Sequence, residues 1–129
     1  MKTALTYDDV LLVPKYSDIE SRSEISLDSD LDNRRTLTLP IISSPMDTVT
    51  GDVMASTMAV NGGLGIIHRY NTPDEQATIV AITKRIANTI RGKDANLVGA
   101  AIGVSGDYLD RARKLVKAGA DIICIDIAH

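Results

Sequence analysis

The chain has 129 residues, of which 44% are hydrophobic and 24% are charged, a composition typical of one soluble globular domain and unlike that of disordered or fibrous proteins. Its 17 acidic and 14 basic side chains leave a formal charge of −3, which gives no indication of binding to nucleic acid or to a membrane surface. The 1 cysteine cannot form an internal disulfide, and no apolar run reaches the ~20 residues that a membrane-spanning helix needs. We therefore expect a cytoplasmic domain that binds neither nucleic acid nor membrane.

Residues 1–36 differ in character from the rest of the chain. They are rich in charge, and the alternating stretch Ser21–Leu27 is typical of a strand or of a hairpin arm that precedes the main fold. We therefore expect an N-terminal arm over residues 1–36 and the principal fold over residues 37–129.

From residue 37 onward, short apolar runs alternate with segments of helical periodicity. Strands are predicted at Pro40–Pro45, Leu64–Ile67, Leu97–Ile102 and Ile122–Ile127. Helices are predicted between them, at Thr50–Asn61, from Thr72 to Ala87, and from Ser105 to Gly119, with a short polar connection at Asn88–Asn96. The residues that carry the helical periodicity are Val53, Met54, Thr57 and Met58, then Ile79, Val80, Ile82, Ile86 and Ala87, then Leu109, Ala112, Leu115 and Val116.

The helix boundaries have recognisable signals. Thr72 is expected to cap the second helix, with Pro73 at its first position and Glu75 completing a capping box. Ser105 is expected to cap the third helix, and Gly119 to end it.

This order of elements, with strands that are apolar on both faces, is typical of a parallel sheet covered by helices. A doubly wound sheet and part of a (β/α)8 barrel both fit the pattern. A dinucleotide-binding doubly wound sheet would carry G-x-G-x-x-G after its first strand, where this chain has Ser43–Asp47. Since a full barrel needs ~250 residues, we predict the amino-terminal half of a barrel, (βα)3β, preceded by the arm.

Polar residues follow several of the predicted strands, at the end where barrel enzymes build their sites. They are Ser44 and Asp47, His68 and Arg69, and Asp126 and His129. The guanidinium of Arg69 has the planar fork that suits a phosphate or a purine edge, and the Asp126 carboxylate must find hydrogen-bond donors because burying it unpaired costs several kcal/mol. The thiol of Cys124 sits inside an apolar strand, where we expect it to behave as an inert hydrophobe with a raised pKa.

Six stretches of the sequence carry a resemblance that covers nearly the whole chain. They are Leu5–Pro14, Ser21–Glu24, Leu39–Thr50, Gly62–Arg69, Val98–Val104 and Ile125–His129. In this order they resemble the first half of the catalytic barrel of the IMP dehydrogenase / GMP reductase family, without the CBS modules that many dehydrogenases insert.

The resemblance implies one of two reactions. A dehydrogenase converts IMP, NAD and water to XMP and NADH through a cysteine adduct at the purine C2, and complete enzymes of this kind can also use potassium. A reductase converts GMP and NADPH to IMP and ammonia. The stretches Ser43–Thr50 and Thr72–Ala77 favour the dehydrogenase, whereas Ser21–Glu24 and the short connection at Asn88–Asn96 favour the reductase.

The resemblance also implies roles for individual residues. Ser44 and Met46 would contact the purine nucleotide, Asp126 would bind the nicotinamide ribose, and His129 would lie near the adenosine half of the cofactor. Arg69 is expected to bind the same nucleotide because its guanidinium follows the second strand at the end where barrel sites form. The family's catalytic cysteine belongs to a glycine-rich loop after the sixth strand, and no such motif occurs in these 129 residues. No catalytic residue is therefore assigned, and we expect the chain to be inactive alone.

Such a half barrel needs a partner, because its open strand edges and apolar inner face invite pairing with another chain. We expect that partner to be a carboxyl-terminal half barrel or a second copy of the chain. A non-catalytic half barrel that serves only as an interaction module is the alternative from a different functional class.

Overall fold

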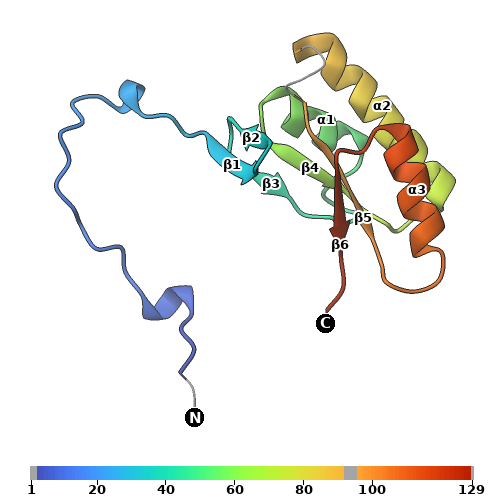
Figure 1. Ribbon diagram of the computed structural model, residues 1–129, viewed down its shortest axis with the longest axis horizontal. Helices are drawn as coiled ribbons and strands as arrows, with labels where there is room; N and C mark the ends of the chain where they lie inside the picture. Colours follow the sequence, from blue (N-terminus) through green and yellow to red (C-terminus); the bar gives the residue numbers. More distant parts are fainter. Residues whose placement is uncertain (1–2, 92–95, 129) are drawn as a thin grey trace.

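The computed structural model describes residues 3–91 and 96–128, and its centre is a parallel sheet with strand order β3-β4-β5-β6. The helices lie on one face of this sheet (Figure 1). In chain order the elements are β3 (Ile42–Ser43), α1 (Asp52–Val60), β4 (Leu64–Ile67), α2 (Pro73–Arg91), β5 (Val98–Ile102), α3 (Tyr108–Ala118) and β6 (Ile122–Ile125).

Helices on a single face distinguish the two architectures that the sequence left open. A doubly wound sheet carries helices on both faces, whereas a barrel keeps them all on the outside. Here residues from the three helices, Ala55, Val80 and Leu115, join one apolar cluster with Ile67 and Val98 of the sheet. The prediction of an α/β fold with a four-stranded parallel sheet is confirmed, and its single helical face is the arrangement found in part of a (β/α)8 barrel.

The opposite face of the sheet is covered at one end by a hairpin that precedes the repeat. Its strands, β1 (Ser29–Asp32) and β2 (Arg35–Leu37), pair antiparallel. Leu37 is buried in a second apolar cluster with Leu64 and Ile66 of β4. The hairpin therefore shields the amino-terminal part of the inner face, and β2 runs across position 36, where the sequence analysis divides the chain.

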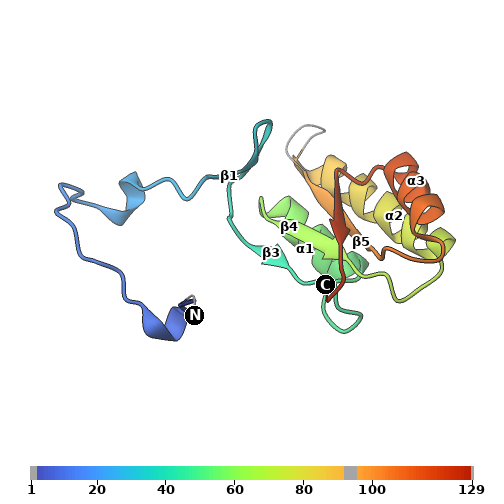
Figure 2. The same ribbon diagram turned by 60° about the horizontal axis from the view of Figure 1, so that its bottom comes forward.

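The segment before the hairpin extends away from the sheet and helices (Figures 1 and 2). Every residue from 3 to 28 is exposed, including Leu11 and Leu12 at 94% and 98%. The strand expected within Ser21–Leu27 is wrong: Arg22–Glu24 forms a short 3-10 helix capped by Ser21, and the hairpin begins after this stretch.

The predicted helices exist, but two of their ends differ from expectation. The capping box of α2 is confirmed, since Thr72 N donates to Glu75 Oε2 at 2.8 Å and Glu75 N donates to Thr72 Oγ1 at 3.3 Å. Gly119 ends α3 in the left-handed region, with φ of 106°. Ser105 does not cap α3, because Gly106 turns at φ of 64° and Asp107 takes the N-cap position. The polar connection expected from residue 88 also begins later, because α2 continues to Arg91.

The buried faces of the helices differ more from the sequence pattern. In α1 the residues at the expected spacing include Val53, which is 75% exposed, while Ala55 and Ala59 are buried. In α3 the expected inward residues Leu109 and Val116 are exposed. In α2 the expected inward residue Ile86 is also exposed. Several polar helix residues are buried instead: Ser56 in α1, Gln76 and Thr83 in α2, and Arg111 in α3.

Small residues are required where α1 meets the sheet. A Cβ added to Gly65 of β4 would lie 2.6 Å from Ala55 Cα, a backbone atom that cannot rotate away. Since the helix and strand are in direct contact, only a short side chain fits on the helix at this place. This close approach explains why α1 turns its alanines toward the sheet and its larger side chains outward.

We expect Gly65→Ala to lower the free energy of unfolding by about 1–3 kcal/mol, because the added methyl group must push α1 away from β4. Gly51→Ala is the control, since a Cβ at Gly51 meets nothing within 4 Å, and its weaker N-cap preference should cost less than about 1 kcal/mol. Urea denaturation followed by circular dichroism measures both. Equal midpoints for the two variants would contradict the close approach.

No helix in the described part of the chain is both long enough and apolar enough to cross a membrane.

Candidate functional site

The carboxyl ends of the parallel strands bring the candidate residues to one edge of the sheet. On the inner face the side chains of Ile66, Ala101 and Cys124 belong to one cluster. Because side chains alternate between faces along a strand, the residues two positions later lie on the same face at this edge: His68, Gly103 and Asp126. The ladder extends that far, since Asp126 N donates to the Ile102 carbonyl at 2.9 Å. The four strands are parallel, so their carboxyl ends share one edge of the sheet, and this is the edge at which the sequence pattern places Ser44, Arg69 and Asp126.

A buried threonine links the ends of β3 and β4. Thr50 is fully buried, and its Oγ1 donates to the Ser44 carbonyl at 2.5 Å. Its own carbonyl accepts from His68 N at 3.3 Å. The side chains of Ser44 and Met46 themselves are exposed, so the backbone of this turn is fixed while its two candidate side chains remain accessible.

Arg69 and Asp126 meet across the strand ends. Arg69 Nε lies 3.6 Å from Asp126 Oδ2, and each side chain is 35% exposed. The guanidinium runs over the carboxyl end of β5, where a Cβ on Gly103 would lie 3.5 Å from Arg69 Nη1, and its Cζ is 5.6 Å from the centre of the Tyr70 ring. A side chain after β4 thus reaches across β5 to one that follows β6, which juxtaposes two candidates far apart in sequence.

This edge offers recognition groups rather than a reacting centre. Arg69 presents N–H donors suited to an anion or to a ring edge, and Asp126 is a carboxylate acceptor suited to hydroxyl groups. Since one group is a cationic donor and the other an anionic acceptor, the edge suits a ligand that carries both anionic and hydroxyl groups. His129 lies outside the described residues. Among residues 3–91 and 96–128, no group of three or more His, Cys, Asp or Glu side chains is placed to hold a metal ion.

Cys124 lies on the inner face of β6, two residues before Asp126. It is half-buried rather than enclosed in the core as the sequence suggested, because β6 is the edge strand of the sheet. Burial raises the pKa of its thiol, and the negative charge of Asp126 raises that pKa further. The thiolate that a nucleophile needs is therefore disfavoured, which supports the prediction that this cysteine is inert.

Cys124→Ala should leave the activity of a completed barrel within about twofold of the parent, because the thiol is disfavoured as a nucleophile. The free energy of unfolding should fall by about 1–3 kcal/mol from lost packing. Steady-state assays and urea denaturation of the same samples measure the two effects. A loss of turnover with the fold retained would instead make Cys124 part of the chemistry.

The structure also contains a buried polar network that the sequence analysis missed. Gln76 of α2 is fully buried, and Arg111 of α3 is 8% exposed; Arg111 Nη1 donates to Gln76 Oε1 at 2.8 Å. A signal was present, since Gln76 precedes Val80 by four residues and Arg111 precedes Leu115 by four, which places each on the buried face of its helix. Polar residues at such positions point to a hydrogen-bonded partner inside the fold.

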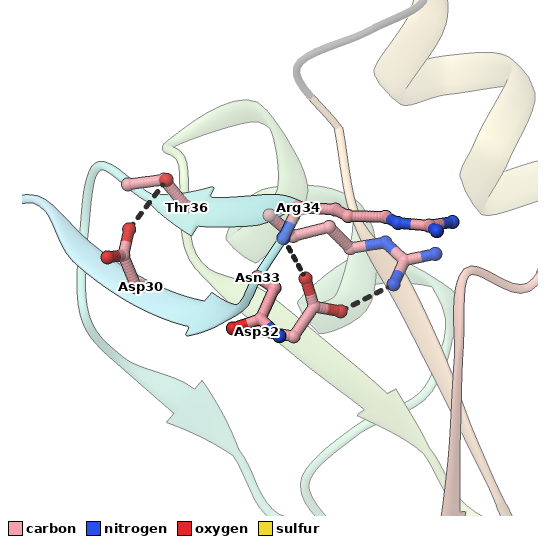
Figure 3. Close-up of a pocket in the computed structure, with 6 residues that line it drawn as sticks. Asp30, Asp32, Asn33, Arg34 and Thr36 are labelled. Carbon is pink, nitrogen blue, oxygen red and sulfur yellow. Dashed lines mark hydrogen bonds and ion pairs between the residues drawn. The ribbon is translucent and has the colours of Figure 1, made fainter.

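A separate hollow of about 620 Å³ lies at the β1–β2 hairpin, away from the strand ends. Figure 3 shows its polar lining, in which the Thr36 hydroxyl donates a hydrogen bond to the Asp30 carboxylate. The Asp32 carboxylate accepts hydrogen bonds from the backbone N–H of Arg34 and from the guanidinium of Arg35. These hydrogen bonds, that from Arg34 first, lower the pKa of the Asp32 carboxyl. Both lining carboxylates already accept hydrogen bonds from neighbouring lining residues, and none of the candidate residues belongs to this hollow.

The chain is similar to known proteins over nearly its whole length. The family model for the IMP dehydrogenase / GMP reductase domain matches residues 4–129. The chain is 55% identical to inosine-5'-monophosphate dehydrogenase of Nitrosopumilus maritimus over 84 residues, which cover 65% of this chain and 18% of that protein. It is 38% identical to the same-named enzyme of Cryptosporidium parvum over 160 residues, covering 97% of this chain and 39% of the relative.

A differently named relative is also similar. The GMP reductase of Leishmania donovani is 46% identical over 81 residues, which cover 63% of this chain and 16% of that protein. The chain thus spans less than half the length of each of these relatives. The similar proteins include relatives with two different activities in their names.

Proposed function

The chain belongs to the IMP dehydrogenase / GMP reductase family, and from that premise we propose that it supplies the amino-terminal half of the barrel of a purine-nucleotide oxidoreductase. The observation that carries the proposal is the meeting of Arg69 and Asp126, 3.6 Å apart, over the carboxyl ends of three parallel strands. Such strand ends are where barrels bind their substrates. In this proposal residues 1–36 are an arm and residues 37–129 the half barrel, working in the cytoplasm.

The purine mononucleotide is assigned to the β3 and β4 side of the edge. Ser44 and Met46 are exposed on a turn whose backbone Thr50 fixes. The Ser44 hydroxyl would hydrogen-bond the nucleotide, the Met46 side chain would pack on the purine, and Arg69 would donate to its phosphate or ring edge. A fixed backbone with accessible side chains supports this assignment, because ordering costs are small when a site is preformed.

The nicotinamide cofactor is assigned to the β6 side. The Asp126 carboxylate fits a ribose, because it is partly exposed and can accept hydrogen bonds from the ribose hydroxyls. His129 is assigned to the adenosine half of the same cofactor. NAD accepts a hydride in the dehydrogenase reaction, and NADPH donates one in the reductase reaction; what this chain's residues contribute is binding and orientation. No residue of this chain is assigned to potassium.

The dehydrogenase reaction, IMP with NAD and water to XMP and NADH, is the preferred assignment, and reduction of GMP by NADPH is the alternative. The test fuses this chain to the carboxyl-terminal half of the N. maritimus relative and assays both substrate pairs by the absorbance of the reduced nicotinamide. We expect NADH formation with IMP. NADPH consumption with GMP alone would select the reductase, and inactivity of a folded fusion with both pairs would contradict the proposal.

An interaction module is the second candidate, and the exposed apolar residues at both edges of the sheet favour it. Ile42 of β3 is 50% exposed and Ile125 of β6 is 61% exposed, so either edge could pair with another chain. Size-exclusion chromatography distinguishes the candidates. A stable dimer of this chain that persists when the carboxyl-terminal half is added would favour the module.

A further inference from the structure

Two buried polar residues, Gln76 on α2 and Arg111 on α3, hold the two ends of the loop that follows β4. Gln76 Nε2 donates to the Ile67 carbonyl at 3.3 Å and to the Ala101 carbonyl at 2.9 Å. Ile67 is the last residue of β4, and Ala101 is the next-to-last residue of β5. One amide group on α2 therefore ties down the carboxyl ends of two neighbouring strands.

Arg111 secures the other end of the loop. Its Nη1 donates to Gln76 Oε1 at 2.8 Å, and its Nη2 donates to the Asn71 carbonyl at 2.9 Å. The Asp107 carboxylate balances the charge, with Oδ2 at 2.9 Å from Nη2, and the Arg111 side chain is only 9% exposed. Residues 67–71 are thus fixed at both ends by hydrogen bonds from one connected pair, which we name the Gln76–Arg111 clamp.

Burying the two polar side chains of the clamp between two helices and a sheet has a large desolvation cost. A buried amide and a buried guanidinium must be fully hydrogen-bonded, and apolar residues of similar volume often stabilise a fold at least as well. What a satisfied polar network adds is a single, well-defined geometry. The segment that it brackets carries His68, Arg69 and Tyr70.

We infer that Gln76 and Arg111 are positioning residues, which hold the loop after β4 so that the Arg69 guanidinium lies over Gly103 and beside Asp126. The geometric part of this inference is independent of any activity. Its consequence for ligand binding rests on the proposed function, because Arg69 is the nucleotide-binding side chain of that proposal.

Trypsin provides a local readout of the clamp, because it cleaves after Arg69. Gln76→Met keeps the side-chain volume and removes the donor and acceptor. We expect cleavage at the Arg69–Tyr70 bond to become about tenfold faster, since local opening no longer breaks these hydrogen bonds. Cleavage after Lys84 and Arg85, within α2, should change less, because it requires that helix to unfold.

The matched control is Arg113→Met, which removes an exposed arginine from α3, the helix that holds Arg111, and it should leave cleavage after Arg69 unchanged. Asp107→Asn guards against a core variant that fails to fold, because Asp107 is exposed and its replacement only weakens the anchor of Arg111. It should accelerate the same cleavage by a smaller factor. Circular dichroism verifies the fold of each variant. If neither Gln76→Met nor Asp107→Asn changes cleavage after Arg69 relative to that after Lys84, the clamp does not hold the loop.

A kinetic arm tests the consequence for ligands in the fused barrel. Gln76→Met should raise KM for the mononucleotide about tenfold while kcat stays within about twofold, because a misplaced Arg69 weakens binding rather than chemistry. Arg111→Lys, which keeps the charge but not the planar fork, should fall between the parent and Gln76→Met. An inactive parent fusion would count against the proposed function but leave the proteolysis result standing. An active parent with accelerated cleavage and unchanged KM would overturn the positioning role.

Discussion

The isolated chain is expected to show no turnover with IMP and NAD or with GMP and NADPH. The proposed reactions proceed through a covalent cysteine adduct, and a covalent route cannot operate without its nucleophile. The one cysteine of the sequence, Cys124, is half-buried in an edge strand, where burial and the nearby Asp126 charge raise the pKa of its thiol. Absorbance assays on a purified, mass-verified sample measure this directly. Turnover by the chain alone would require a nucleophile that the proposal does not contain.

Asp126→Asn in the fused barrel is expected to lower kcat/KM for the nicotinamide cofactor by about 10- to 100-fold, the loss typical of hydrogen bonds to a charged group. The variant keeps the side-chain shape, removes the carboxylate charge, and leaves the guanidinium of Arg69 without its ion-pair partner. Asp110→Asn, an exposed carboxylate on α3, is the control and should change kcat/KM by less than about twofold. A change confined to the KM for the mononucleotide would show that Asp126 contacts the mononucleotide rather than the cofactor.

The parts of the fold that depend on local sequence could be predicted. The capping box at Thr72 and Glu75 and the left-handed turn at Gly119 follow from short-range chemistry, and both are present. β4 occupies Leu64–Ile67, as its continuous apolar run indicated. A buried apolar run that begins directly after Gly62 and Gly63 and ends before polar residues leaves few alternative arrangements, so pattern and structure agree there.

The buried faces of α1 and α3 could not be predicted by the rule that large apolar residues face inward. α1 packs so closely against Gly65 of β4 that a residue as small as Ala55 is required at the contact, and Val53 faces outward. In α3 the buried position one turn before Leu115 is taken by Arg111, because the Asn71 carbonyl and the Gln76 side-chain amide accept its hydrogen bonds. Both outcomes depend on which residues of distant elements come together, and periodicity within one helix does not contain that information.

The candidate site shows the same division. The sequence placed Ser44, Arg69 and Asp126 at strand ends, and a parallel sheet brings such ends to one edge. The contact between Arg69 and Asp126 depends on the arginine crossing β5, which Gly103 permits because no side chain stands in the way. The fixed position of the loop that carries Arg69 depends on Gln76, whose partners include a carbonyl 25 residues away in the sequence.

Titration of the chain with a separately purified carboxyl-terminal half barrel tests the central claim most directly. With IMP and NAD present, we predict no NADH formation by either part alone, and activity that rises with added half barrel until the two are equimolar. The same titration with Asp126→Asn should reach saturation at the same ratio with a much lower rate. Activity of the chain alone, or a stable equimolar complex that is inactive with both IMP and GMP, would contradict the assignment of this chain as half of a nucleotide oxidoreductase site.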